Sequence, residues 1–400
     1  MGKASLLLVL GFSGLFMMMG YNSNSVSNYA VENMVDYHTK TMAHNIAVSG
    51  ANLAANEIFF DNNWTKGYSN LPFHNGTLDV NVEILDVFQN IRKLTVTGNY
   101  RGTTKNVEVI LQPSSFSKFA YYSESEGKNI WWTNNDTVWG PFHTQDRLRS
   151  YRHPVFMGKA SSRKKLVYYQ SKKKDAPLFL GGYEKGVDLP IPMDGVANVN
   201  LAAKDDGMLF KGQDTVYLTF ANDSLKYRFS YGANDTTVLL SSVAPNGVIF
   251  ADNMTIRLKG TVSGQYSLGC SGTIYLDDDI VYETDPRVNP NSSDLLGIIA
   301  TNEVLITDNL PNHSDINIHA SIYCENGGFG AENYSSRPPS GDIKLLGGII
   351  QHIRRPVGTF GKSGIKSGFS KNYYYDERLM LASPPMFPNT GSFEIVSWFE

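Results

Sequence analysis

The chain of 400 residues is poor in charge and in cysteine. Lys, Arg, Asp and Glu together make up 18% of it and the formal net charge is −3, so we expect no nucleic-acid partner. Its two cysteines, Cys270 and Cys324, have no metal-ligand spacing around them, which excludes a zinc-type cysteine site. They form either one disulfide, if the compartment is oxidising, or two buried free thiols.

Sequence motifs of the common enzyme classes are also missing. The chain contains no nucleophile elbow, HExxH pair, P-loop or dinucleotide fingerprint, and we expect no cofactor and no metal. The densest acidic group contains Asp277 and Asp279, with Glu283 close behind. Such carboxylates bind Ca²⁺ or act on a polysaccharide when they share one side of a sheet, but strand residues alternate sides, so at most Asp277 and Asp279 do so. The other interpretation is a group of turn and surface acids, and we predict a protein that is not an enzyme.

Charge is absent altogether between Lys3 and Glu32, and this is the strongest positive feature of the sequence. The apolar stretch from Ser5 to Gly20 lies at the lower length limit of a membrane-spanning helix. Residues 1–27 are therefore predicted to be a membrane anchor or a signal. A cleaved signal peptide is the alternative, but no clear small-x-small site follows the stretch, which favours a retained single-pass anchor with an extracytoplasmic body. The apolar side chains predicted to lie in the membrane include Leu6, Leu10, Phe12, Phe16 and Met18.

Residues 28–112 carry a helical pattern followed by three strand patterns. Apolar residues recur three, four or seven apart from Val31 to Ile58, with small residues between them, and predict an amphipathic helix that ends near Phe60. Alternating apolar and polar residues then predict strands at 78–84, 94–98 and 107–109. The dry face of an antiparallel sheet needs a cover, and the helix supplies one.

Residues 113–176 are predicted to be an aromatic and basic connecting region. Its Arg and Lys clusters are either a solvated face or a contact for an anionic glycan or lipid headgroup. The clusters comprise Arg147, Arg149, Arg152, Arg163, Lys164, Lys165 and Lys172–Lys174.

Residues 177–365 are rich in glycine turns and short apolar runs. Ile256 and Ile274, eighteen residues apart, each head a short strand, and similar runs recur at Ile298, Ser321 and Gly348. Short strands with polar turns and a period near twenty predict stacked coils of a right-handed parallel β-helix, with a β-sandwich as the alternative. Residues 366–400, dense in aromatics and prolines, are predicted to form an extended tail that caps the open end of the stack.

The body of the chain resembles bacterial surface proteins that carry a domain of unknown function, DUF4900. The resemblance covers most of residues 116–400 and implies no known activity. The matching segments are Asp136–Thr144, Asp278–Tyr282 with Asp285–Arg287, Gly347–Gln351, and the tail pairs Tyr375–Asp376, Arg378–Leu379, Pro384–Pro385, Phe387–Pro388 and Ser397–Trp398.

The N-terminal region resembles minor pilins of the PilX type, in which an apolar helix continues into a helix with small residues, as at 47–55 here. The sequence has no Gly-Phe-Thr-Leu-Ile-Glu segment and no glutamate near the start of the apolar stretch. Neither processing by a prepilin peptidase nor incorporation into a filament therefore follows from the resemblance.

Together these patterns predict a non-enzymatic, membrane-anchored protein of the bacterial cell envelope, related to minor pilins and acting in surface assembly or adhesion. Its expected partners are the membrane, pilus-assembly components or other envelope proteins, and a glycan. The alternatives are a secreted β-helix enzyme that acts on polysaccharide, with Asp277 and Asp279 as its carboxylates, and a purely structural solenoid spacer.

Overall fold

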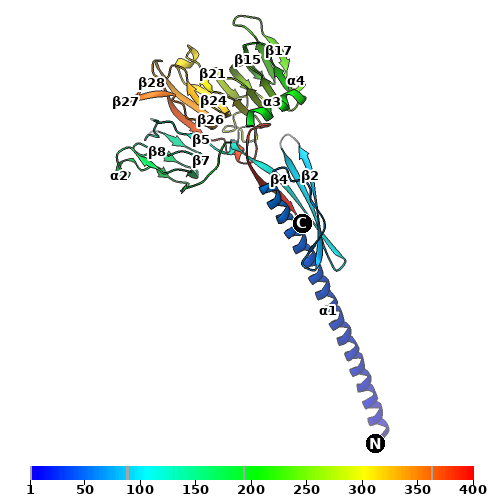
Figure 1. Cartoon of the computed structure of the whole chain (residues 1–400). Coiled ribbons are helices and arrows are strands. Elements are labelled where there is room, and N and C mark those ends of the chain that lie inside the picture. The colour runs from blue at the N-terminus through cyan, green and yellow to red at the C-terminus, as the bar shows by residue number, and fades with distance from the viewer. Residues whose placement is uncertain (1, 87–89, 129, 135, 192–193, 362–363) are drawn as a thin grey trace. The chain divides into compact units, whose positions relative to one another are not determined.

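The computed structural model describes residues 2–86, 90–128, 130–134, 136–191, 194–361 and 364–400 (Figure 1). The chain forms two compact units. Unit 1 comprises residues 1–112 and 393–400, and unit 2 comprises residues 113–392. The chain therefore passes from one unit to the other twice.

Unit 1 is built on one continuous helix, α1 (Gly2–Phe60). The uncharged segment from Tyr21 to Asn28, where the predicted anchor meets the predicted amphipathic helix, is part of this helix. The reason is that the first proline of the chain is Pro72 and no glycine lies between Gly20 and Gly50, so nothing in this stretch breaks the backbone hydrogen-bond ladder.

The second half of α1 packs on a five-stranded sheet whose order is β1-β2-β3-β4-β29 (Figure 1). Strands β2, β3 and β4 pair antiparallel, as the three alternating patterns predicted, and β1, for which no strand was predicted, pairs antiparallel with β2. Two-residue turns with positive φ join two of the hairpins, at His74-Asn75 and at Arg101-Gly102. The strands are β1 (Tyr68–Phe73), β2 (Gly76–Asp86), β3 (Ile91–Tyr100), β4 (Thr103–Ser115) and β29 (Asn389–Phe399).

Unit 2 contains a large mixed sheet whose main ladder is parallel throughout. Its strands follow one another in the order β14-β18-β20-β22-β24-β26-β5-β7-β10-β13. A second parallel ladder runs β15-β19-β21-β23-β25. From β14 to β26 the chain passes between these two ladders, so most strands pair with the preceding and following strands of their own ladder. The pairing of Ile256 with Ile274 matches the eighteen-residue spacing seen in the sequence.

Most strands of unit 2 are short, whereas β26 has 15 residues and β28 has 11. In chain order they are β5 (Tyr121–Ser125), β6 (Thr137–Val138), β7 (Phe142–Thr144), β8 (Arg149–Ser150), β9 (Val155–Phe156), β10 (Ala160–Ser162), β11 (Val167–Tyr168), β12 (Leu178–Phe179), β13 (Tyr183–Lys185), β14 (Met208–Phe210), β15 (Thr215–Asn222), β16 (Ser224–Arg228), β17 (Thr236–Leu239), β18 (Val248–Ala251), β19 (Thr255–Val262), β20 (Gln265–Cys270), β21 (Ile274–Tyr282), β22 (Leu295–Ala300), β23 (Val304–Ile306), β24 (Ile316–Cys324), β25 (Phe329–Ala331), β26 (Pro339–Ile353), β27 (Gly358–Gly361) and β28 (Gly364–Tyr374). The helices are α2 (Lys172–Asp175), α3 (Gly195–Asp206) and α4 (Leu240–Val243), with 3₁₀ turns η1 (Phe116–Lys118), η2 (Pro311–His313) and η3 (Glu377–Met380).

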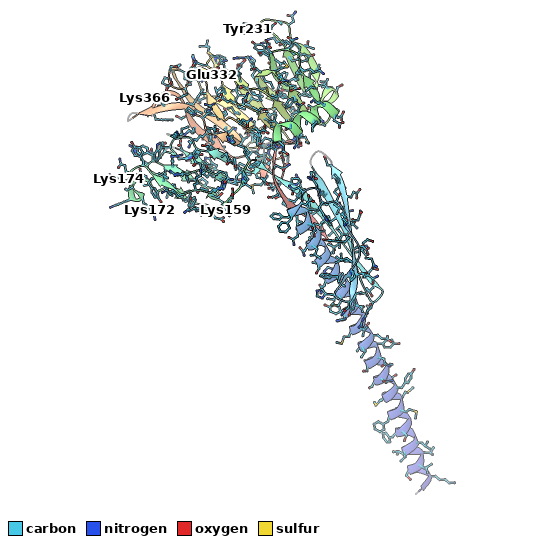
Figure 2. The ribbon with its side chains drawn as sticks, viewed as in Figure 1. Lys159, Lys172, Lys174, Tyr231, Glu332 and Lys366 are labelled. Carbon is cyan, nitrogen blue, oxygen red and sulfur yellow. The ribbon has the colours of Figure 1, made fainter. Side chains whose placement is uncertain are left out.

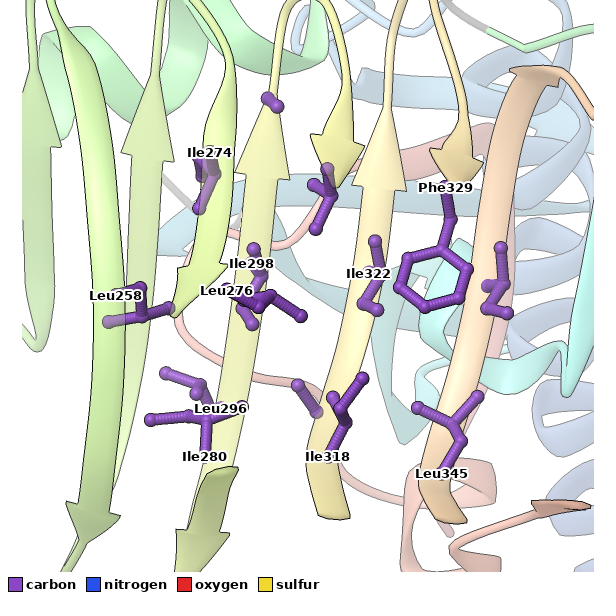
Figure 3. Packing of buried hydrophobic residues seen from close by; sticks show 14 of the residues in the cluster. Leu258, Ile274, Leu276, Ile280, Leu296, Ile298, Ile318, Ile322, Phe329 and Leu345 are labelled. Atoms are coloured by element: carbon purple, nitrogen blue, oxygen red, sulfur yellow. The ribbon is translucent and has the colours of Figure 1, made fainter. Parts of the chain in front are cut away.

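The core of unit 2 is a set of side-chain columns that run along the ladders (Figure 3). Paired positions place Leu268, Ile298, Ile322 and Ile349 in one inward column. The next residue of each strand faces outward, and an apolar cluster under α3, which includes Phe250, Ile299 and Tyr323, covers part of that face.

Two predicted segments are organised differently from the expectation. Residues 113–176 are not a connecting region, because strands β5 to β11 lie within them and β5 pairs with β26. The expected capping tail 366–400 is also wrong as a unit. Its first part belongs to β28, which pairs with β26, and its last part is β29, the fifth strand of the sheet in unit 1. Both differences have the same cause. The strand pairings β5–β26 and β4–β29 join residues far apart in the chain, and local sequence patterns do not predict such pairings.

Candidate anchoring helix and polar clusters

Residues 2–38 of α1 form the candidate functional element. Every described residue before Thr39 is exposed, except Ser25, which is partly buried. The predicted membrane residues Leu6, Leu10, Phe12, Phe16 and Met18 are between 53% and 70% exposed on this helix. Within the described residues, α1 is the one helix that is long and apolar enough to cross a membrane.

This exposed part is longer than a bilayer requires. Residues 2–38 extend over about 55 Å at about 1.5 Å per residue, whereas the hydrocarbon core is about 30 Å thick. Exposed apolar side chains nevertheless continue past the first twenty residues, to Met34 and Val35. Glu32, Asp36 and Lys40 follow a spacing of four and so lie along one line of the helix, where Lys40 Nζ and an Asp36 carboxylate oxygen are 2.7 Å apart.

The rest of α1 is held by a stripe of small residues. Ala43, Ala47, Ala51 and Ala54 recur three or four apart and are fully or almost fully buried against the sheet. A Cβ added to Gly98 of β3 would lie 2.2 Å from the Ala43 carbonyl oxygen, so the two backbones touch here. This close approach fixes where the helix rests on the sheet.

At the predicted acidic site, Asp277 and Asp279 make contacts with residues on or next to neighbouring strands. Arg257 Nη2 donates to Asp277 Oδ1 at 2.7 Å, and Thr307 Oγ1 donates to the same oxygen at 2.7 Å. Asp279 instead accepts from the backbone N–H and the side-chain amide of Asn317, at 2.8 and 2.9 Å. Pairing of β21 changes from β23 to β24 between Leu276 and Ile280, so the acids occupy a corner of the coil. The two carboxylates thus have separate partners. Among the described residues, no group of three or more His, Cys, Asp or Glu side chains is placed to hold a metal ion, so Glu283 is not part of such a group.

Cys270 and Cys324 are both buried and free, which corrects the disulfide alternative. Cys270 pairs with Ala300, and Ala300 pairs with Cys324, so one strand separates the cysteines. At about 4.8 Å per strand their Cα atoms are about 10 Å apart, beyond the reach of a disulfide at about 7 Å. Burial raises the pKa of Cys270 to about 11 and that of Cys324 to about 12, so both thiols are protonated at neutral pH.

Sequence reasoning missed a buried charged cluster, which we call the seam, where β26 and β28 meet β5 and β6. Arg354 Nη1 and Glu126 Oε2 are 2.7 Å apart, and both side chains are almost fully buried. Trp132 Nε1 and Tyr121 Oη each donate to Glu126 at 2.9 Å, and the Arg354 guanidinium lies 4.0 Å from the Trp132 ring centroid. No sequence signal marks the pair, because Glu126 and Arg354 are 228 positions apart.

A second ion pair completes the seam. Lys371 Nζ lies 3.3 Å from Asp136 Oδ2. Burial lowers the pKa of Lys371, and the Asp136 carboxylate opposes this shift. The adjacent cavity, lined by Trp132, Arg354 and Lys371 among others, measures about 10 Å³, which is room for about one water and not for an organic substrate.

Comparison with known proteins finds similarity among solved structures and nowhere else. No family model matches the chain. No curated protein matches it either. Among solved structures, the chain is similar to the crystal structure of the competence-associated pilin ComZ from Thermus thermophilus, with a TM-score of 0.37 and 11% identity, over 90% of this chain and 97% of that chain.

Proposed function

We propose that this chain is a membrane-anchored protein of the bacterial cell envelope, built like a minor pilin, that acts without catalysis in surface assembly or adhesion. One observation carries the proposal: a single helix is apolar and exposed over its first half and seated on an antiparallel sheet over its second half. A bilayer is the environment that suits the exposed half, because no other part of the described chain covers it.

Assembly with other helices is supported by the surplus length of α1. The exposed apolar residues beyond the first twenty, such as Val31, Met34 and Val35, lie past the reach of one hydrocarbon core. Such residues in water are costly unless another protein covers them. The charged line through Glu32 and Asp36 leaves the remaining sides of the helix free for this contact.

For unit 2 we propose a parallel β-helix that presents a surface away from the cytoplasm. Its support is the two parallel ladders, in which consecutive coils stack one strand apart. The resemblance to surface proteins with DUF4900 stays a prediction from the quoted segments alone.

The anchor is tested by membrane fractionation of cells that produce the full chain, with N-terminal sequencing of the mature protein. We expect the chain in the membrane pellet after alkaline extraction, with its N-terminus ahead of residue 21. A soluble protein that begins between residues 21 and 28 would overturn the anchor and indicate a cleaved signal.

Assembly is tested by cross-linking in membranes. The native cysteines are buried, so single cysteines placed by Met34→Cys and Glu32→Cys report on two sides of one helix. We expect oxidation to cross-link the Met34→Cys chain to itself or to a neighbouring envelope protein, and the Glu32→Cys control to stay monomeric. Equal cross-linking of both variants, or of neither, contradicts a packed apolar side.

The enzymatic alternative is tested at the acidic corner. Asp277→Asn with Asp279→Asn removes the partners of Arg257 and Asn317, so we expect a less stable protein and unchanged reducing-sugar release from acidic polysaccharides. Hydrolysis by the parent chain that disappears in a variant of normal thermal stability would establish the enzyme and dismiss the proposal.

A further inference from the structure

Unit 2 carries a strong local excess of positive charge. Residues 147–185 contain eleven Lys and Arg against two Asp and Glu, a net of +9, in a chain whose total is −3. Across all of residues 113–392, cations and anions number 28 each, so the rest of unit 2 carries −9. The positive charge is therefore confined to the coils of β8 to β13.

Most of these cations are not neutralised locally. Arg149 and Lys164 pair with Asp146, Lys159 pairs with Glu184, and Arg163 pairs with Asp188. The remaining seven are exposed and make no ion pair within the described residues. We call them the basic patch: Arg147, Arg152, Lys165, Lys172, Lys173, Lys174 and Lys185. Figure 2 shows Lys172 and Lys174 projecting from this end of unit 2.

The loop around the one-turn helix α2, which carries three of these lysines, has a fixed conformation. Asp175, which is buried, accepts hydrogen bonds from the backbone N–H groups of Arg152 at 2.8 Å, Gln170 at 2.7 Å and Ser171 at 3.0 Å. Burial alone would raise the pKa of Asp175, but these three N–H groups lower it, so the carboxylate stays charged near neutral pH. A buried anion thus clamps Lys172–Lys174 beside Arg152.

Aromatic rings border the same loop. Tyr169 is 56% exposed and packs edge-on against Trp131 and Tyr151, with centroid distances of 5.2 and 4.9 Å. The parallel pairing of β8 with β11 brings Tyr151 and Tyr169 to equivalent places on neighbouring coils. Rings of this kind offer apolar faces to the C–H groups of a sugar, while the neighbouring cations offer charge.

From this arrangement we infer that the basic patch, with Tyr169 and Trp131 at its border, is a binding site for an acidic polysaccharide of the uronic-acid type. Carboxylates spaced along such a polymer meet cations on successive coils, and its sugar rings meet the aromatic border. A nucleic acid is disfavoured because its dense phosphates would also approach the net negative remainder of unit 2. The inference goes beyond the proposed anchoring function and does not depend on the helix.

The test uses the full chain in phosphatidylcholine nanodiscs and alginate as the probe, with dextran as the uncharged comparison. We expect alginate binding that weakens steeply with added salt, and no dextran binding. Lys172→Gln with Lys173→Gln and Lys174→Gln should weaken alginate binding at least tenfold. The matched control, Lys204→Gln with Lys211→Gln and Lys259→Gln, removes the same charge from exposed sites outside the patch and should change binding less than twofold.

A second variant separates a built site from general attraction. Asp175→Asn makes the patch more positive but removes the carboxylate that holds the N–H groups of Arg152, Gln170 and Ser171. We therefore expect weaker alginate binding, while the melting temperature of unit 2 stays the same. Stronger binding by Asp175→Asn, equal loss in the control triple variant, or binding of dextran overturns the inference. Preferential binding of single-stranded DNA or of phosphatidylglycerol vesicles by the same lysines overturns it in favour of a different partner.

Discussion

At the scale of single residues, the buried charges of the seam have the largest consequence for the fold. Glu126 and Arg354 are 228 positions apart in the sequence of unit 2, and both contact the side chains of Tyr121 and Trp132. A buried ion pair contributes little net stability, but removal of one partner leaves an uncompensated charge. We therefore expect the pair to disfavour any other pairing of the strands at this junction.

We predict that Glu126→Gln destabilises unit 2 by about 3–5 kcal/mol, because Arg354 then stays buried without a counter-charge. The double change Glu126→Gln with Arg354→Met should recover much of this loss. Urea unfolding followed by tryptophan fluorescence measures both. Glu184→Gln, which breaks an exposed pair with Lys159, is the matched control and should cost less than about 1 kcal/mol.

Two buried histidines give unit 2 a sensitivity to acid. Burial lowers the pKa of His143 to about 4. Burial, aided by the Arg287 cation, lowers that of His319 to about 4 as well. Because the unfolded chain binds these protons near pH 6.5 and the folded chain does not, stability is complete above about pH 6.5 and falls as the pH drops toward 4.

We predict a loss on the order of 3 kcal/mol per histidine across that window. Melting curves at pH 7 and pH 5 should show a clear drop in the transition of unit 2. His143→Phe keeps a ring beside Tyr122 but cannot be protonated, so it should reduce the drop. An identical pH dependence in this variant would show that His143 has no part in it.

At the scale of elements, the decisive contact is between α1 and β3. Small residues on the helix and Gly98 on the strand let the two backbones approach closely. Gly50, about one helical turn after Ala47, makes a second close contact, because a Cβ added there would lie 2.8 Å from Val96 Cγ1. Larger side chains would lift the helix from the sheet and open the core between Ile46 and Val96.

We predict that Gly98→Ala destabilises unit 1 by about 1–3 kcal/mol, because the new Cβ meets backbone atoms of Ala43 and Ala47 that cannot rotate away. Thr95→Ala on the same strand is the control and should have a small effect. Hydrogen exchange of α1 amides between residues 43 and 58 reports the change. Unaltered protection in Gly98→Ala would mean that the helix does not rest where the structure places it.

At the scale of the whole molecule, the chain end belongs to the unit in which the chain begins. Strand β29 adds to β4, and Phe393 and Trp398 pack against the core of unit 1. The fifth strand of this sheet can therefore be added only after all of unit 2 has been synthesised. A pairing of such high sequence separation forms late and depends on the rest of the chain.

We predict that deletion of residues 393–400 speeds hydrogen exchange in β4 and in the seated part of α1, because the edge of β4 and the Phe393 contact are lost. Exchange in β22 and β24 of unit 2 should stay the same. Ile395→Ser with Val396→Ser, which alters exposed side chains of β29, serves as the control. Equal exchange in the deleted and full chains would show that β29 contributes nothing to unit 1.

The elements that depend on near neighbours in the chain could be predicted from the amino-acid sequence. The apolar start, the period of the helix up to Phe60, the alternating strands of unit 1 and the spacing of Ile256 and Ile274 are all readable because each pattern lies within a few turns or one coil. These patterns were also enough to place the membrane candidate at Leu6 to Met18.

The contacts between segments far apart in the chain became known from the three-dimensional structure. It joined β5 to β26, brought Glu126 to Arg354, separated Cys270 from Cys324 by one strand and returned β29 to the first sheet. It also clamped the basic loop through Asp175. Each of these contacts joins residues that are tens to hundreds of positions apart, and each lies in a buried site that several elements form together. Neither feature produces a periodic pattern in the amino-acid sequence.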